Sequence, residues 1–227
     1  MTEYRTDLTR DLTRRGYGLI AAAAVFVLLY VATDFVTPSL ASSSLPLPND
    51  PVGEARAWFA DNQLAAVMMG VTQFLSVLGL AAFATGLPRV AGTRAQTEAA
   101  ERARPWGLLA VALMMLSSVL ACLLAALAPS ASVDTVALLR TANFIAGGTA
   151  HVLALGIFVW LASRMPGFGK PIRVLAWVAV VPAVLSLTSL LFFQGAAFIL
   201  VGRLLCMIWT VSAAVSVTRG LARGRWA

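Results

Sequence analysis

Long apolar runs separated by short polar segments dominate the pattern of this 227-residue chain. A helix that crosses a bilayer needs about 20 mostly apolar residues. Six runs reach that length, and we predict a helix over each: 17–37, 62–87, 106–128, 135–162, 173–193 and 196–217. The pattern therefore predicts one all-α membrane domain over 1–227, a polytopic integral membrane protein built as a six-transmembrane-helix bundle.

The composition agrees with this class. Hydrophobic residues make up 59% of the chain and charged residues 12%, with a mean hydropathy of +0.84. Soluble domains are roughly half apolar and a quarter charged. The first run, 17–37, follows Arg14 and Arg15 as a secretory signal would, but it is longer than the apolar region of a signal peptide. We therefore interpret it as the first transmembrane helix.

Loop charge predicts the orientation of the bundle. Lys and Arg near helix ends are retained on the cytoplasmic side of a membrane. All of the 17 Lys and Arg residues except Arg56, Arg140 and Arg203 lie before the first run, between the second and third, between the fourth and fifth, or after the sixth. Both termini are therefore expected in the cytoplasm, with 1–15 as a cytoplasmic tail. Because these cations are spread over four segments, we expect anionic lipid headgroups as their partners, and no nucleic acid.

The largest loop on the opposite side is 38–61. It begins with Pro and Ser residues and carries a helix-start signal, with Asp50 as N-cap and Pro51 at the first helical position. Trp58 and Phe59 follow at the depth expected for a membrane interface. We expect this outer loop to fold back as an interfacial helix over the outer ends of the bundle.

Three charged residues, Asp34, Arg140 and Arg203, lie inside the apolar runs. Charge at that depth is rarely kept without a partner or a role. The predicted helix directions place all three in one outer layer, with the arginines about 8 to 11 Å below the outer surface at 1.5 Å per residue.

Three explanations of this layer remain open. In a structural one, Asp34 pairs with one or both guanidinium groups and fixes the helix registration. In a functional one, two cations facing one anion leave a positive surplus that an external lipid phosphate, fatty carboxylate or amphiphilic acid completes. In the third, each arginine side chain extends to the outer interface.

The fourth predicted helix carries a polar stripe. At about 100° per residue, Arg140, Asn143, Gly147 and His151 fall within roughly 80° of one another. An adjacent row of alanines from position 142 to 154 favours close helix approach, so we expect the stripe to face the bundle interior. The glycine at 147 and its neighbour would leave room for a neighbouring side chain or a ligand.

His151, the single histidine, has two interpretations. One is a neutral imidazole hydrogen-bonded to an adjacent helix; the other is a proton relay or a ligand contact. Together these patterns predict a candidate ligand-binding site with supporting polar residues. Its members are Asp34, Arg140, Asn143, His151 and Arg203, supported by Tyr30, Gln73, Gln194 and Thr210.

The sequence shows no catalytic, metal or cofactor motif. Cys122 and Cys206 belong to no Cys-x-x-Cys pair, and no second ligand stands at metal spacing from His151. Asp34 is the lone carboxylate within a predicted helix, so paired acids are missing. We expect no cofactor, and the sequence disfavours an enzyme without deciding the question.

Three functions therefore stay open. We expect binding or transport of a small amphiphilic or anionic ligand through the outer polar layer, which predicts a cavity there. A non-catalytic helper subunit of a membrane complex instead predicts a lipid-facing stripe of small or aromatic residues. The third alternative is an intramembrane enzyme acting on a lipophilic substrate. The expected partners are the lipid bilayer, a lipid or small amphiphilic anion, and protein subunits.

The order of features resembles a family of uncharacterised six-helix bacterial integral membrane proteins of unknown function. The segments that carry the resemblance are Arg14-Arg15-Gly16-Tyr17-Gly18, Phe59-Ala60-Asp61-Asn62-Gln63, Pro171-Ile172-Arg173-Val174-Leu175-Ala176-Trp177 and Ile208-Trp209-Thr210-Val211. The resemblance implies the same fold and a bacterial cytoplasmic membrane. It implies no activity, and it assigns a role to no residue.

Overall fold

The computed structural model describes residues 2–223 and 226, with side chains from residue 14 onward. Within these residues the protein is helical and has no strand. The α-helices are α1 (Thr2–Leu40), α2 (Val52–Asp61), α3 (Gln63–Gly86), α4 (Arg94–Leu127), α5 (Val133–Phe144), α6 (His151–Ala162), α7 (Lys170–Leu185) and α8 (Ala196–Ala222). Short helices join them: η1 (Leu87–Val90), the π-helix η2 (Ile145–Ala150), η3 (Ser186–Leu190) and η4 (Phe193–Gly195).

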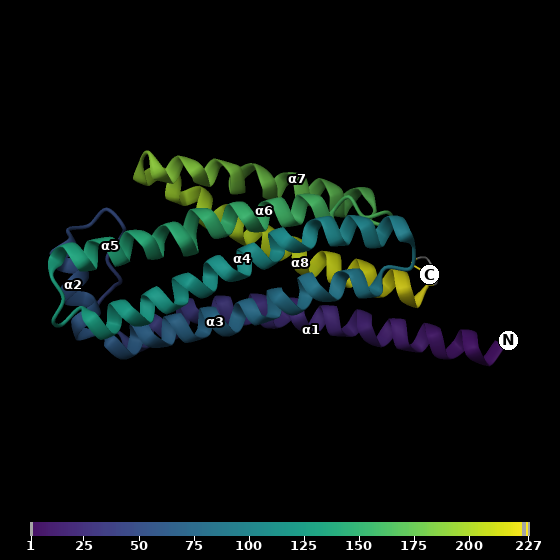
Figure 1. Ribbon diagram of the computed structural model, residues 1–227, viewed down its shortest axis with the longest axis horizontal. Helices are drawn as coiled ribbons and strands as arrows, with labels where there is room; N and C mark the ends of the chain where they lie inside the picture. The colour runs from purple at the N-terminus through teal and green to yellow at the C-terminus, as the bar shows by residue number, and fades with distance from the viewer. Residues whose placement is uncertain (1, 224–225, 227) are drawn as a thin grey trace.

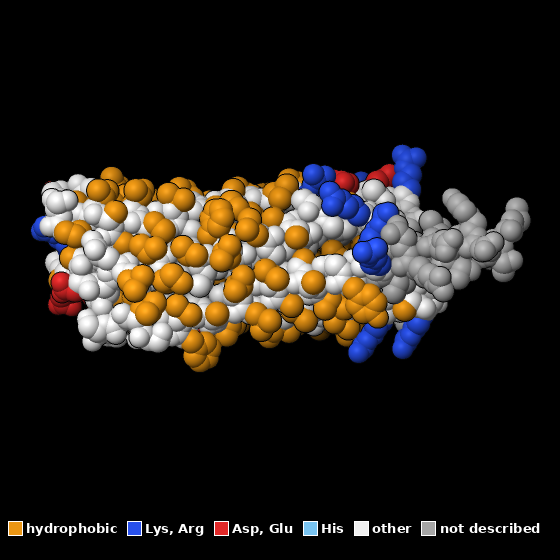
Figure 2. Space-filling model, turned by 90° about the horizontal axis from the view of Figure 1, so that it is seen from below, with side chains coloured by type: hydrophobic (Ala, Val, Ile, Leu, Met, Phe, Trp, Pro, Cys, Tyr) orange, Lys and Arg blue, Asp and Glu red, His pale blue; other side chains and the backbone are white. Residues whose placement is uncertain are grey.

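Six helical segments among the described residues are long and apolar enough to cross a membrane: Arg14–Leu40, Gln63–Val90, Arg94–Leu127, Val133–Ala162, Lys170–Leu190 and Phe193–Ala222. This confirms the six predicted spans and the all-α bundle. The fourth span joins α5, η2 and α6 into one continuous helix. On the face shown in Figure 2, apolar side chains are spread over the middle of the molecule, as expected of a multi-pass membrane protein.

The two ends of the bundle differ in character. Both chain termini lie at one end, which we call the terminal end, and α2 lies at the other, which we call the loop end (Figure 1). On the face shown in Figure 2, Lys and Arg side chains gather toward the terminal end. The tail expected over 1–15 is, from Thr2, the start of α1, and side chains before residue 14 lie outside the described residues.

Close helix contacts depend on small residues. Helix α1 runs beside α3 and α8, while α4 lies between α3 and α6. At Gly79 of α3, an added Cβ would stand 2.5 Å from the backbone nitrogen of Phe26. Next to it, Ser76 Oγ donates a hydrogen bond to the carbonyl oxygen of Phe26, at 2.6 Å. These contacts fix α1 against α3, which positions Tyr30 deeper in the bundle.

Helix α4 begins well before the predicted start at 106. The Thr93 hydroxyl accepts a hydrogen bond from the backbone N–H of Gln96, and the side-chain oxygen of Gln96 accepts one from the backbone N–H of Thr93. This reciprocal capping box satisfies amides that would otherwise be free at a helix start. The charged stretch after it is therefore helical although it is too polar to be part of an apolar run.

The outer loop corrects two details of the prediction. Pro51 is the N-cap of α2, and the Asp50 carboxylate accepts a hydrogen bond from the backbone of Leu47 at 2.6 Å. Trp58 and Phe59 face inward and are 4% and 6% exposed, so they form part of a small core. As expected, α2 packs across the ends of its neighbours, contacting α3, α4 and α5.

Candidate functional site

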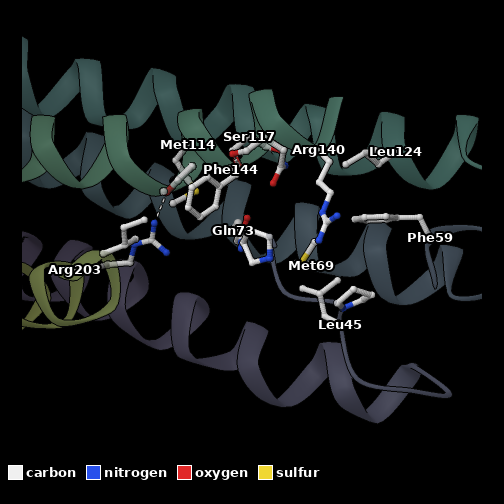
Figure 3. A pocket seen from close by; sticks show the side chains of 16 residues that line it. Leu45, Phe59, Met69, Gln73, Met114, Ser117, Leu124, Arg140, Phe144 and Arg203 are labelled. Atoms are coloured by element: carbon white, nitrogen blue, oxygen red, sulfur yellow. Dashed lines mark hydrogen bonds between the residues drawn. The ribbon is translucent and has the colours of Figure 1, made fainter. Parts of the chain in front are cut away.

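A cavity of about 270 Å³ lies near the loop end of the bundle. Residues from α2, α3, α4, α5, η2 and α8 form its walls, and Leu45, Pro46 and Pro48 form its roof. Figure 3 shows the side chains of Arg203 and Arg140 at opposite ends of the cavity. No Asp or Glu lines it within the part of the chain that the structure describes. The cavity therefore carries two cations and no lining anion.

Arg203 occupies the deep end of the cavity and is 8% exposed. Its Nη1 donates to the hydroxyl of Tyr30, and its Nη2 donates to the carbonyl oxygen of Gly147. The guanidinium carbon also lies 4.9 Å from the centre of the Tyr30 ring. Among the described residues, Arg203 forms no ion pair and its Nε has no hydrogen-bond partner. A buried charge without an ionic partner costs free energy.

Arg140 lies at the loop end of the cavity, on α5. Its Nη1 donates to the carbonyl oxygen of Asp50 at 2.9 Å, and its Nη2 donates to that of Leu47. Both acceptors belong to the segment that follows α1. The side chain therefore lines the cavity and holds the backbone of its roof.

Residues 41–51, which we call the roof segment, are held at their other end by α2 and the residue that follows it. The Asn62 side-chain oxygen accepts hydrogen bonds from the backbone and hydroxyl of Ser42, at 2.7 and 3.0 Å. The indole nitrogen of Trp58 donates to the carbonyl oxygen of Ser43 at 2.9 Å. The roof segment is thus attached through polar contacts at both ends, while apolar residues between them cover the cavity.

The polar stripe of the fourth span faces the interior, as predicted. Asn143 Nδ2 donates to the carbonyl oxygen of Ser117 at 2.7 Å, and Ser117 Oγ donates to that of Asn143 at 3.3 Å. A Cβ on Gly147 would stand 2.1 Å from Ser117 Oγ, so this glycine does leave room for a neighbouring side chain. Gly147 lies within the π-helix η2, and π-turns in long helices are frequent at functional sites.

Asp34 does not pair with either arginine, which overturns the structural explanation of the charged layer. It is exposed and lines a separate cavity of about 380 Å³. Leu45, Met69 and Gln73 line both cavities and so form the wall that the two cavities share. No ion pair joins Asp34 to any residue that the structure describes.

His151 is fully buried and does not line the cavity. Its Nδ1 lies 2.8 Å from the carbonyl oxygen of Ala110 on α4. A carbonyl can only accept, so Nδ1 carries the proton and donates. His151 Nε2 has no partner among the described residues. This is the interhelical hydrogen bond of the first interpretation.

Of the four residues predicted to support the site, two lie near the arginines and two do not. Tyr30 binds Arg203, and Gln73 lines the cavity without a hydrogen bond to any described residue. Thr210 Oγ1 donates to the carbonyl oxygen of Cys206 within α8, at 2.8 Å. Gln194 is exposed in η4. The structure brings Tyr30 and Gln73 to the two arginines and leaves the other two away from the cavity.

Most of the apolar lining carried no signal in the sequence. Met69, Met114 and Leu124 resemble any other apolar residue of a spanning helix, and the roof prolines resemble any loop prolines. Phe59 was expected at the membrane interface and instead forms part of the wall. A repeating period predicts which face of a helix is apolar, but it cannot predict where the packing of helices leaves a space.

No group of three or more His, Cys, Asp and Glu side chains comes together to hold a metal ion in the described residues. Cys122 and Cys206 are both free thiols. No protein-family model, curated protein or solved structure matches this chain.

Proposed function

We propose that this chain is a multi-pass protein of a bacterial cytoplasmic membrane that binds or transports a small amphiphilic anion in the cavity between Arg140 and Arg203. The anionic group binds the guanidinium of Arg203, and the apolar part lies against the apolar walls. Both termini are in the cytoplasm, so the cavity opens toward the outer leaflet. We also propose that the chain is a member of the six-helix bacterial family that its sequence resembles.

The observation that carries the proposal is the buried guanidinium of Arg203. Its hydrogen bonds go to a hydroxyl and a carbonyl oxygen, both neutral, and its Nε is free of partners among the described residues. Charged groups in protein interiors are normally paired. An anion in the adjoining cavity would supply the missing partner with charge-assisted hydrogen bonds.

The chemistry of the walls supports an amphiphilic ligand. Met69, Met114, Leu124 and Phe144 offer apolar and polarisable surface, and methionines adapt to flexible chains. Gln73 adds an amide with free hydrogen-bonding capacity. A few polar groups in a mostly apolar pocket are typical of small-molecule sites.

Charge at the ends of the bundle supports the orientation. The Lys and Arg side chains on the face in Figure 2 gather toward the terminal end. The cavity lies toward the other end, because Leu45, Pro46 and Pro48 of the loop that precedes α2 line it. By the positive-inside rule, the terminal end faces the cytoplasm. A ligand would then reach the cavity from the outer leaflet or the outer solution.

Binding of decanoate to the purified protein in lipid nanodiscs tests the proposal, with decanol as an uncharged probe of equal chain length. We expect decanoate to bind and decanol to bind at least about tenfold more weakly. Arg203→Gln should weaken decanoate binding by about 10- to 100-fold, because a hydrogen bond to a charged group contributes about 1.5–3 kcal/mol.

Arg219→Gln is the matched control, since Arg219 is an exposed arginine near the terminal end of the same helix. It should leave decanoate binding unchanged. Equal binding of decanoate and decanol, or equal loss in the two variants, would contradict the proposed anion site.

A further inference from the structure

A second cavity, of about 460 Å³, lies beside the first at the loop end. We call it the vestibule. It is lined by part of the roof segment, by α5 and by the turn between α7 and α8. Pro48, Arg140 and Phe144 line both cavities. These three residues therefore form the partition between the vestibule and the inner cavity.

The vestibule faces the surroundings of the protein. Leu191 and Phe192, on its wall, are 84% and 49% exposed. Its polar lining includes Asn49, Thr141 and Ser189, together with Asp50, whose carboxylate accepts a hydrogen bond from the backbone of Leu47. It thus presents both hydrogen-bonding groups and apolar surface to an arriving amphiphile, as the inner cavity does.

The partition is held by the side chain of Arg140. Its two donors bind the carbonyl oxygens of Asp50 and Leu47, both in the roof segment. A carboxylate or phosphate forms stronger hydrogen bonds with a guanidinium than a neutral carbonyl does. An anion in the vestibule would therefore compete with the roof segment for Arg140.

We propose that Arg140 controls access to the cavity: an anion entering the vestibule takes the place of the two roof carbonyls on Arg140, which frees the roof segment and opens the way to Arg203. This deepens the proposed function and rests on it. The two arginines then have separate roles. Arg203 determines how tightly the anion is held, and Arg140 determines how fast an anion enters and which charge is admitted.

The test measures access with thiol reagents and needs no bound ligand. Met114 lines the inner cavity, does not line the vestibule and is buried, so Met114→Cys is the reporter. Cys122→Ala and Cys206→Ala remove the other thiols. Two methanethiosulfonates of similar size are compared in nanodiscs, one carrying a sulfonate and one a trimethylammonium group.

With Arg140 present, we expect the anionic reagent to modify the reporter faster than the cationic one. Arg140→Gln should abolish this preference and raise the rate for the cationic reagent at least about tenfold, because the roof loses two charge-assisted hydrogen bonds. Arg140→Lys keeps the charge but cannot bind both carbonyls in the same way. Arg140→Lys should therefore keep the preference for the anionic reagent, while its reporter reacts faster with both reagents than in the protein with Arg140. This variant provides the test if Arg140→Gln does not fold.

Arg56→Gln is the matched control. Arg56 also lies at the loop end and donates to two backbone carbonyls, those of Ala128 and Pro129, at 3.0 and 3.3 Å. It lines neither cavity, so its loss should leave both rates unchanged.

Unchanged rates in both Arg140 variants, or equal changes in Arg56→Gln, would overturn the access role whether or not decanoate binds. Rates that change as expected in a protein that fails to bind decanoate would support the access role and contradict the proposed ligand. The two proposals therefore fail separately.

Discussion

Arg203 is the residue on which the account depends most. It is buried on α8 between Tyr30 of α1 and Gly147 of η2, so one side chain joins three spans near the middle of the molecule. Its partners satisfy part of its hydrogen-bonding capacity but none of its charge. A group placed in this way is expected to serve binding at the expense of stability.

Arg203→Met should therefore separate the two properties. Removing a buried charge that has no ionic partner and leaving an unbranched apolar side chain should raise the melting temperature of the ligand-free protein by at least about 2 °C. The same variant should bind decanoate as weakly as Arg203→Gln does. Thermal unfolding in a detergent that removes bound lipid measures the change in melting temperature. A marked fall in melting temperature would mean that Arg203 is mainly structural.

The two adjacent glycines of η2 provide a second test at this scale. At Gly147 an added Cβ would stand 2.1 Å from Ser117 Oγ, whereas at Gly148 its nearest neighbour is the flexible end of Ile199 at 3.2 Å. Gly147→Ala should therefore destabilise the protein by about 1–3 kcal/mol, while Gly148→Ala should be near neutral.

Both substitutions gain the same helix propensity, so the difference reports the contact with Ser117. Ser117→Gly added to Gly147→Ala should restore most of the loss in an SDS unfolding titration. Equal stability of the two alanine variants would show that α4 and the fourth span approach less closely than described.

The features of single residues that could be predicted from the sequence are those fixed by the helical period and by position along a span. The stripe through Arg140, Asn143 and Gly147 follows from helical geometry alone. Of the three explanations left open for the charged layer, the one in which Asp34 pairs with an arginine was wrong, because depth says how far a residue lies along a span but not toward which neighbour it points. Asp34 lies at the right depth and faces a different cavity.

At the scale of elements, the roof segment is the part that links the cavity to its surroundings. It has no regular structure beyond its turns, and it is held by side chains of α2, α5 and Asn62. The order of the roof segment therefore depends on a few polar contacts, each of which a single substitution can remove.

Asn62→Ala should loosen the roof segment without unfolding the bundle. The change removes the acceptor for both Ser42 donors, and each such hydrogen bond contributes about 1 kcal/mol. Amide hydrogen exchange should rise over 41–51 and stay unchanged in α3 and α4.

Gln63→Ala is the control, because Gln63 is the next residue and its amide binds Ala125 of α4 instead of the roof segment. Exchange over 41–51 that rises equally in both variants would contradict the specific attachment described for Asn62.

The elements themselves were predictable because spans must be about 20 apolar residues long. What the hydrophobic pattern missed was helix outside the apolar runs, such as the charged start of α4, which depends on the capping pair Thr93 and Gln96. The cavity could not be predicted either, since its walls come from separate spans whose rotation the pattern does not specify.

Taken as a whole, the molecule has two different ends along the axis of the bundle. The termini lie at one end, and α2 lies at the other (Figure 1). The loop-charge pattern of the sequence predicts the orientation of this axis in the membrane, and the proposed route of the ligand depends on it.

Orientation can be measured with single cysteines and a membrane-impermeant thiol reagent on intact bacterial cells that express the protein. Ser44→Cys in the roof segment should be modified from outside, and Ala95→Cys near the start of α4 should react only after the membrane is permeabilised. Both positions are exposed, so reactivity depends on their side of the membrane. The reverse pattern would place the cavity in the inner leaflet and contradict the outer route.

The anion site can be tested directly by growing crystals of the protein in a lipid phase with a terminally brominated decanoate and locating the bromine by anomalous diffraction. We expect the carboxylate within hydrogen-bonding distance of Arg203 and a bromine peak among the apolar walls of the cavity. A cavity without the probe, with both guanidinium groups still bound only to hydroxyl and carbonyl oxygens, would contradict this expectation and make the two arginines structural.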